Sequence, residues 1–225
     1  MAAAQPENHS VTRTLRRLLA GFPVEWLPAL FDLTHALFQW ITARHDGLYD
    51  ILDYDSTLEL LDRNGKRAVF RKHQRVKFLQ DNVIAFQDYA WGEGDIFAQY
   101  RVSPGRVADR YQEGDRWTVL ISLRESKQRG DVEEFAMERT VTGGFTRAEE
   151  WRQVEIRHPT RHLRLAVIFP RGRPCRRAFL TRRSRNHSLE LDSRHFLALP
   201  DGRQMVRWET THVPPLEIYT LHWEW

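Results

Sequence analysis

Apolar and polar residues alternate with a period of two along most of the chain after residue 55, and this pattern constrains the fold most. Successive side chains of an extended strand point to opposite faces, so each apolar row predicts a strand with one buried side. The clearest rows lie within Trp117–Leu123, Phe135–Val141, Leu163–Phe169 and Tyr219–Trp225.

Turn residues divide these rows into short strands. Asn64-Gly65 lies between Thr57–Asp62 and Arg67–Leu79, which predicts a β-hairpin. Pro200-Asp201-Gly202 predicts a turn just before Gln204–Thr210. About ten strands with such spacing favour a mainly β fold, an antiparallel β-sandwich or barrel over residues 46–225.

The chain has a different character before residue 46. Residues 1–9 predict a flexible tail, and residues 10–45 predict a helical segment that begins at a capping Ser10. The segment packs either on the β domain or on a partner, and in the second case it also offers a route to oligomerisation. The residues expected to dock a partner are Trp26, Phe31, Phe38 and Trp40.

Composition narrows the chemistry. Cys175 is the only cysteine in 225 residues, which excludes an intrachain disulfide and a cysteine-rich zinc site. His158 and His162 are separated by Pro159, so we expect no metal site and no cofactor. Arginines beside Cys175 favour a lowered thiol pKa, although a lone cysteine is more often a passive packing residue.

Two absences in the sequence bear on location. The chain has no uncharged apolar stretch of eighteen residues, so we expect no membrane span. Its first residues lack the basic and apolar regions of a secretory signal. We therefore expect a cytoplasmic protein.

Arginine is concentrated in the segment from Arg157 to Arg185, which contains no acidic residue. This segment carries +10 in a chain of formal net charge +4, so the remainder carries −6. The arginines either form a face for an anionic partner or pair with acidic residues elsewhere in the chain. We expect Arg171–Arg177 to be a hairpin tip with few neighbours. The candidate anion-binding residues are Arg157, Arg161, Arg164, Arg171, Arg173, Arg176, Arg177, Arg182, Arg183 and Arg185.

The string Asp53-Tyr54-Asp55-Ser56-Thr57-Leu58 resembles the first motif of the haloacid dehalogenase phosphatases. The resemblance implies that Asp53 is a nucleophile, that Asp55 is an acid and base, and that both help to hold Mg²⁺. It also implies a fold with alternating strands and helices, which the β-rich remainder of the sequence does not predict.

A second short pattern runs from Arg182 to His187 and fits R-x4-H, which resembles the catalytic core of the HEPN ribonucleases. The resemblance implies that the arginine and the histidine bind a phosphate and move protons. It also implies a helical fold, whereas this segment predicts strand and turn.

These observations favour a non-catalytic recognition or adaptor module whose partner is another protein, with nucleic acid as a second candidate partner. One alternative is a Mg²⁺-dependent hydrolase of phosphate compounds that uses Asp53 and Asp55. The other is a structural subunit of a larger complex.

Overall fold

A computed structural model describes residues 47–185 and 187–225, which include nearly all of the predicted β domain. The predicted tail, the helical segment and the docking residues Trp26, Phe31, Phe38 and Trp40 lie outside the described residues.

The described chain is mainly β, as predicted, and has fourteen strands and no α-helix. Two short 3₁₀ turns, η2 (Arg183–Arg185) and η3 (Ser193–His195), are its only helical elements. Nothing in this region is long and apolar enough to serve as a membrane-crossing helix. The strands are β1 (Tyr49–Leu60), β2 (Arg67–Phe78), β3 (Val83–Ala90), β4 (Asp95–Ser103), β5 (Arg106–Glu113), β6 (Arg116–Lys127), β7 (Val132–Thr142), β8 (Glu149–Glu155), β9 (Thr160–Phe169), β10 (Arg177–Arg182), β11 (His187–Glu190), β12 (Phe196–Ala198), β13 (Gln204–Thr210) and β14 (Ile218–Glu224).

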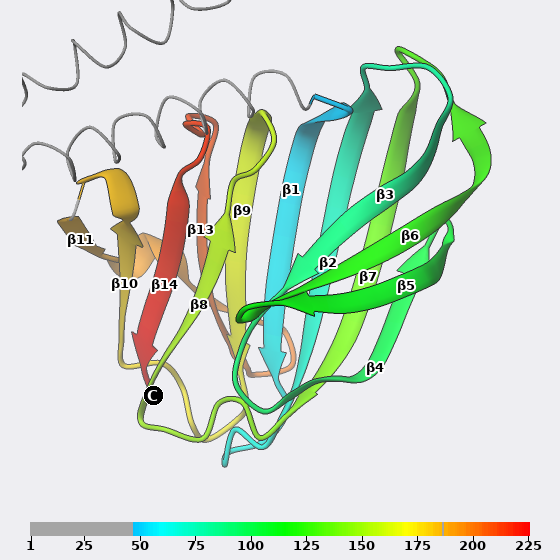
Figure 1. Cartoon of the computed structure of the whole chain (residues 1–225). Coiled ribbons are helices and arrows are strands. Elements are labelled where there is room, and N and C mark those ends of the chain that lie inside the picture. The colour runs from blue at the N-terminus through cyan, green and yellow to red at the C-terminus, as the bar shows by residue number, and fades with distance from the viewer. Residues whose placement is uncertain (1–46, 186) are drawn as a thin grey trace, which may run out of the picture. The chain divides into compact units, whose positions relative to one another are not determined.

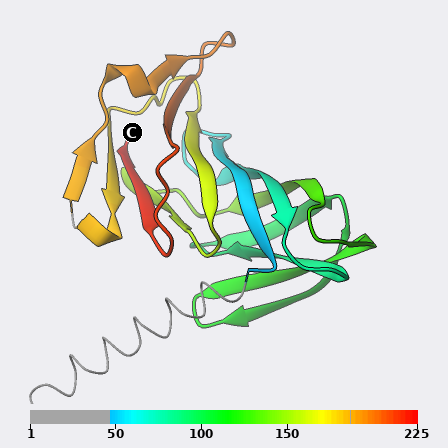
Figure 2. The same cartoon turned by 90° about the horizontal axis from the view of Figure 1, so that it is seen from above.

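The strands form three sheets (Figure 1). The large sheet has seven strands in the order β12-β13-β9-β1-β2-β7-β4. A four-stranded sheet has the order β11-β10-β14-β8, and a three-stranded sheet has the order β3-β6-β5. The view from above shows both smaller sheets on the same side of the large sheet (Figure 2).

The prediction of a purely antiparallel arrangement is wrong at the centre of the large sheet. There β1 runs parallel to β9, with Ile51 paired to Thr160 and Glu59 paired to Ile168. A half-buried strand has the same period of two whether its neighbour is parallel or antiparallel. The sequence pattern therefore predicted the strands without predicting their relative direction.

The predicted hairpin is confirmed between β1 and β2. Asp62 holds the turn, because its carboxylate accepts hydrogen bonds from the backbone amides of Asn64, Lys66 and Arg67 at 3.1, 3.0 and 2.9 Å. Gly65 has a φ of 65°, which glycine adopts without the steric penalty of a Cβ atom. The predicted turn before Gln204 is likewise confirmed, between β12 and β13.

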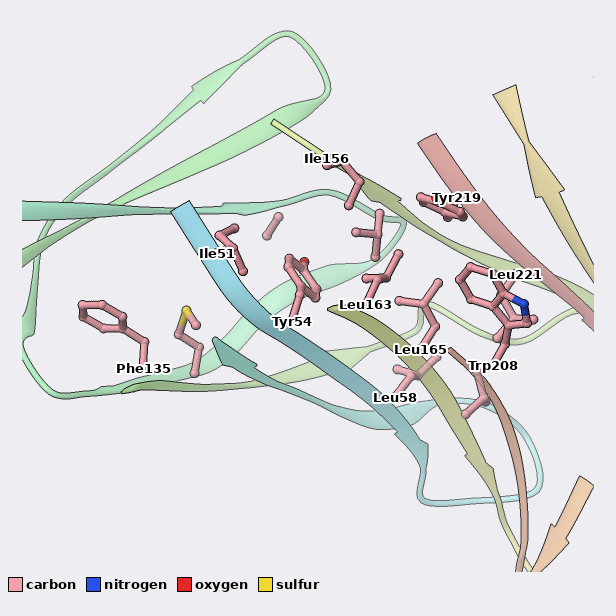
Figure 3. Close-up of a cluster of buried hydrophobic side chains, with 14 of the residues drawn as sticks. Ile51, Tyr54, Leu58, Phe135, Ile156, Leu163, Leu165, Trp208, Tyr219 and Leu221 are labelled. Carbon is pink, nitrogen blue, oxygen red and sulfur yellow. The ribbon is translucent and has the colours of Figure 1, made fainter. Parts of the chain in front are cut away.

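The core lies between the large sheet and the two smaller ones. The predicted rows on β9 and β14 are buried in it, from Leu163 to Phe169 and from Tyr219 to Trp225. Figure 3 shows part of this cluster, with Tyr54 and Leu58 of β1 near Leu163 of β9.

Arg171–Arg177 is not a hairpin tip, which corrects the prediction. The segment leads from β9 in the large sheet to β10 in the four-stranded sheet, so it crosses between layers. Each of these strands pairs with partners distant in sequence, β9 with β1 and β13, and β10 with β11 and β14. A short arginine-rich link can join two strands of one sheet as a hairpin or two strands of different sheets. Its local sequence does not distinguish these two connections.

A candidate anion-binding cavity between two edge strands

The layer that covers the large sheet is divided, and the division opens a cavity. β8 is the last strand of the four-stranded sheet, and β3 is the first strand of the three-stranded sheet. Two adjoining hollows lie between them and share Tyr54, Lys72, Tyr89 and Trp91 in their walls. The larger hollow has an empty volume of about 740 Å³, including the part open to solvent.

Three cationic side chains line the larger hollow, and all three are buried. Lys72 is on β2, Arg139 is on β7 and Arg152 is on β8. The alternation of each strand places them on its inner side, where only 5%, 8% and 5% of these residues are exposed. Charged residues are almost never buried this far unless a partner offsets the charge.

Arg139 and Arg152 converge on one aromatic ring. Their guanidinium carbons lie 4.4 and 4.9 Å from the centre of the Phe70 ring. Within the described residues, neither guanidinium lies within ion-pair distance of a carboxylate. Both guanidinium groups therefore contact the same ring in a buried site, and the contacts seen for them among the described residues are with neutral groups.

Among the described residues, some of the N–H donors of Arg139 and Arg152 have hydrogen-bond partners, and others do not. Arg152 donates to the carbonyl oxygens of Ser56 and Ala166 at 3.0 and 2.9 Å, and also to the Ser56 hydroxyl. Its buried Nε has no hydrogen-bond partner among the described residues. Arg139 makes one long hydrogen bond, 3.4 Å, to the carbonyl oxygen of Ile96.

The buried arginines are electrostatically strained. The pKa of Arg152 is lowered to about 10, chiefly by burial and also by the neighbouring charge of Arg139, while Tyr54 and Asp55 oppose the shift. Burial also lowers the pKa of Arg139, although Asp88 and two tyrosines oppose the shift. A guanidinium group is not deprotonated at neutral pH in proteins, so the site keeps its positive charge.

Lys72 differs from the arginines because it has an acidic partner. Its ammonium group donates to Asp88 Oδ1, and the Tyr100 hydroxyl donates to Asp88 Oδ2 at 2.8 Å. Burial opposes the charge of Lys72, but the attraction of Asp88 outweighs it and raises the lysine pKa. The Asp88 carboxylate is thus already occupied by Lys72 and Tyr100.

Carboxylates also occur at the other end of the hollow. Glu150 accepts a hydrogen bond from the Arg147 amide at 2.7 Å, and Glu93 forms an ion pair with the Arg147 guanidinium at 2.7 Å. Burial raises the pKa of Glu150, which favours its neutral form. The inner part of the hollow therefore remains the cationic part.

Aromatic residues surround the cationic centre. Besides Tyr54 and Phe70, the lining includes Tyr89, Trp91, Phe145 and Trp151. A concave site with a few directed polar groups among aromatic walls suits a ligand that has one anionic group and an apolar part. Guanidinium groups match the geometry of carboxylate and phosphate.

The ten arginines predicted to bind an anionic partner are distributed over several elements. They lie on β9, on β10, in η2 and in the connections that precede and follow β9. Arg164 donates to Asp55 at 2.8 Å and to Glu209 at 3.0 Å across neighbouring strands. Arg157 and Arg177 each pair with a glutamate at 3.0 Å.

Other arginines of this group brace the fold. Arg173 donates to the carbonyl oxygens of Arg63 and Arg147 and lies over the Trp225 ring at 3.7 Å. Arg171 donates to the carbonyl oxygen of Asp201, and Arg182 lies over Trp208 and Tyr219. An anion-binding role for the ten arginines stays a prediction.

The two aspartates of the string Asp53–Leu58 lie on the exposed side of β1, while Tyr54, Ser56 and Leu58 point into the core. Asp53 pairs with Arg75 at 3.2 Å and Asp55 pairs with Arg164 at 2.8 Å. Within the part of the chain that the structure describes, no group of three histidine, cysteine, aspartate or glutamate residues is placed to hold a metal ion. These two aspartates stand on a strand of an open sheet, without the alternating helices that the phosphatase resemblance implies.

The remaining candidate residues from the sequence are the R-x4-H pair, Cys175 and the two histidines His158 and His162. Arg182 ends β10 and His187 begins β11, so the R-x4-H pattern spans two strands rather than a helix. Cys175 is buried, and burial raises its thiol pKa to about 12, which is opposite to the shift expected from its cationic neighbours in sequence. His162 lies 3.6 Å from Asp53, and the His158 ring lies 4.3 Å from the Tyr49 ring.

Sequence reasoning missed the cationic centre, although part of its signal was present. Arg139 interrupts the apolar row Phe135-Met137-Val141 at an inward position, and Arg152 precedes Val154 and Ile156 in the same way. A cation in an inward row is a sign of a buried polar site. Its convergence with a second cation depends on strands in different sheets.

Comparison with known proteins gives only distant similarities in structure. No family model matches the chain, and no curated protein matches it. An M1 zinc metallopeptidase from Deinococcus radiodurans matches with 12% identity and a TM-score of 0.46, over 77% of this chain. A glutamate-to-alanine mutant of that enzyme bound to a Tyr-Ser-Ala substrate matches with 11% identity and a TM-score of 0.48, over 78% of this chain. This chain covers 42% of the length of each of these two proteins, and similarity at this level identifies neither a family nor a function.

Proposed function

We propose that the β domain is a non-catalytic recognition module, sandwich-like in its layering, that binds an anionic group in the cavity between β8 and β3. The observation that carries the proposal is the convergence of Arg139 and Arg152 on Phe70 without a carboxylate beside either guanidinium among the described residues. The anionic group is a carboxylate or a phosphate attached to an apolar body.

The energetics support a bound anion. Burying an unpaired charge costs several kcal/mol, and a neighbouring charge of the same sign adds to that cost. An anion placed between the two guanidinium groups removes both penalties and gains charge-assisted hydrogen bonds. Part of the free energy spent on burying these charges is therefore recovered when an anion binds.

The alternatives have less support. The arginine-rich segment makes many of its contacts within the domain, so fewer guanidinium groups are free for nucleic acid or an acidic surface. The hydrolase alternative needs carboxylates that are available to Mg²⁺, but Asp53 and Asp55 each have an arginine partner. A role as a structural subunit does not account for a cationic cavity.

The test measures thermal stability with anionic and neutral ligands of the same shape. Phenylphosphate and benzoate are compared with benzyl alcohol at constant ionic strength. The two anions are expected to raise Tm, because a ligand at a hundred times its Kd adds about 2.7 kcal/mol to the stability of the form that binds it. Benzyl alcohol is expected to leave Tm unchanged.

Variants show whether the cavity is responsible. Arg139→Met and Arg152→Met remove one buried charge each, and Arg124→Met removes an exposed charge on β6 as a matched control. The anion effect is expected to be lost in the first two variants and kept in the control. An equal anion effect in all three variants, or no effect on the unmodified protein, would falsify the proposal.

A further inference from the structure

We infer that the anionic group belongs to an extended acidic peptide, which adds a strand to the free edge of β8 and directs a carboxylate side chain between Arg139 and Arg152. This inference rests on the proposed function and names its ligand class. Addition of a strand to a sheet edge gives affinity through backbone hydrogen bonds and specificity through alternate side chains.

The edge of β8 faces the two hollows. Glu150 to Val154 line the larger hollow without a gap, and Glu155 to Arg157 continue along the smaller one. Successive side chains of a strand point to opposite faces. An unbroken run of lining residues therefore means that the hollows border the side of the strand, where the backbone groups lie, rather than one of its faces.

That edge has no strand partner among the described residues. β8 pairs only with β14, from Glu149 opposite Glu224 to Glu155 opposite Ile218. Figure 1 shows β14 on one side of β8 and β3, in a separate sheet, on the other side. An exposed edge leaves a row of unpaired amide and carbonyl groups that can pair with another chain.

The facing edge of β3 is different, because side chains of β3 and β2 contact the backbone groups of Tyr89 there. The backbone amide of Tyr89 donates to Asp88 Oδ1 at 2.9 Å. The carbonyl oxygen of Tyr89 lies 3.4 Å from the Lys72 ammonium. An incoming strand therefore finds free backbone groups on β8 and occupied ones on β3.

Side chains on β8 define what the added strand carries. A residue of the peptide that points inward lies beside Glu150, Arg152 or Val154, the buried positions of β8. An acidic residue opposite Arg152 reaches the cationic centre. Its neighbours in the peptide point outward, beside Trp151. This residue is 41% exposed, and its indole ring favours an apolar partner on the added strand. The recognised sequence is thus an acidic residue flanked by apolar residues.

Binding of a fluorescein-labelled peptide, measured by anisotropy with the full chain, tests the inference. The probe is a capped five-residue peptide with a central glutamate flanked by valines. Two further peptides carry N-methyl groups on alternate amides, one in each register, because an added strand has only every second amide directed at β8. A glutamine replaces the glutamate in a fourth peptide.

The expected result depends on register. The unmodified peptide binds, one N-methylated register loses affinity about tenfold or more while the other keeps it, and the glutamine peptide also loses about tenfold or more. The Arg152→Met variant weakens the glutamate peptide and leaves any residual binding of the glutamine peptide unchanged.

Two other results would overturn the inference, and they differ in what they say of the proposed function. If benzoate stabilises the protein but the peptide does not bind, or binds equally in both N-methylated registers, the cavity takes a small anion and only the peptide inference fails. If neither benzoate nor the peptide binds, the proposed function fails as well.

Discussion

Lys72 shows how one buried charge is held in this domain. Its ammonium group and Asp88 form an ion pair inside the cavity wall, with only a few per cent of either side chain exposed. Removing one partner leaves the other charge buried and unpaired. We expect Lys72→Met to lower the free energy of unfolding by about 3–5 kcal/mol, measured by urea denaturation.

The double variant Lys72→Met/Asp88→Asn distinguishes the pair from simple packing. Its loss of stability is expected to be smaller than the sum of the two single losses, because neither charge is left unpaired. Arg67→Met is a matched surface control, since the Arg67 side chain is 66% exposed and its ion pair with Asp62 is expected to contribute less than about 1 kcal/mol. Additive losses at positions 72 and 88 would show that the ion pair contributes nothing of its own.

Single residues also mark the limit of what the sequence predicts. The inward position of Arg139 follows from the row in which it stands, yet the approach of Arg152 to the same ring depends on two strands that belong to different sheets. Cys175 illustrates the same limit. Its sequence neighbours suggest a lowered thiol pKa, but burial, which only the fold determines, raises the pKa to about 12.

Two glycines with nearly equal backbone angles allow a test at the level of one turn. Gly65 has a φ of +65°, and a Cβ atom there would lie 1.5 Å from the carbonyl oxygen of Phe145. Gly114 has a φ of +64°, and a Cβ atom there would meet nothing within 4 Å. We expect Gly114→Ala to cost about 1–2 kcal/mol for the left-handed conformation alone.

Gly65→Ala is expected to cost at least twice as much in the same urea measurement, because the link between β7 and β8 must move as well. Phe145 donates its backbone amide to the Gly65 carbonyl oxygen at 3.2 Å, so this contact is lost with the movement. Equal losses in the two variants would mean that the close packing at Gly65 has no energetic weight.

The strands were more predictable than the sheets. Period two located the buried rows of β7, β9 and β14, and turn residues located the β1–β2 and β12–β13 connections. The alternation of apolar and polar residues does not depend on the direction of a strand or on the sheet to which it belongs. For this reason the parallel β1–β9 pair and the crossing of Arg171–Arg177 between layers were not foreseen.

The molecule as a whole is built from contacts between distant parts of the chain. The central strand β1 pairs with β9, so Ile51 lies opposite Thr160. Because closing such long loops costs entropy before any contact is gained, we expect refolding over milliseconds to seconds or longer. Stopped-flow tryptophan fluorescence measures it, since Trp208, Trp223 and Trp225 become buried. Refolding complete within microseconds would contradict this view of the topology.

The distribution of charge was informative at the scale of the whole molecule. It did not decide whether the arginines form a face for an anionic partner or pair with acidic residues of the same chain. The sequence showed a strongly basic segment in an otherwise acidic chain, and the large sheet places some of these charges opposite each other. Arg164 of β9 stands between Asp55 of β1 and Glu209 of β13. The cationic cavity uses Lys72, Arg139 and Arg152, all of which lie outside the arginine-rich segment.

The division of the covering layer has a mechanical consequence. No ladder of backbone hydrogen bonds joins β8 to β3, so the four-stranded and three-stranded sheets can slide or tilt against each other on the large sheet without breaking one. The width of the opening is then set by side-chain contacts, which are softer than a ladder. The opening between β8 and β3 can therefore accommodate ligands of different width while each sheet keeps its own strand register.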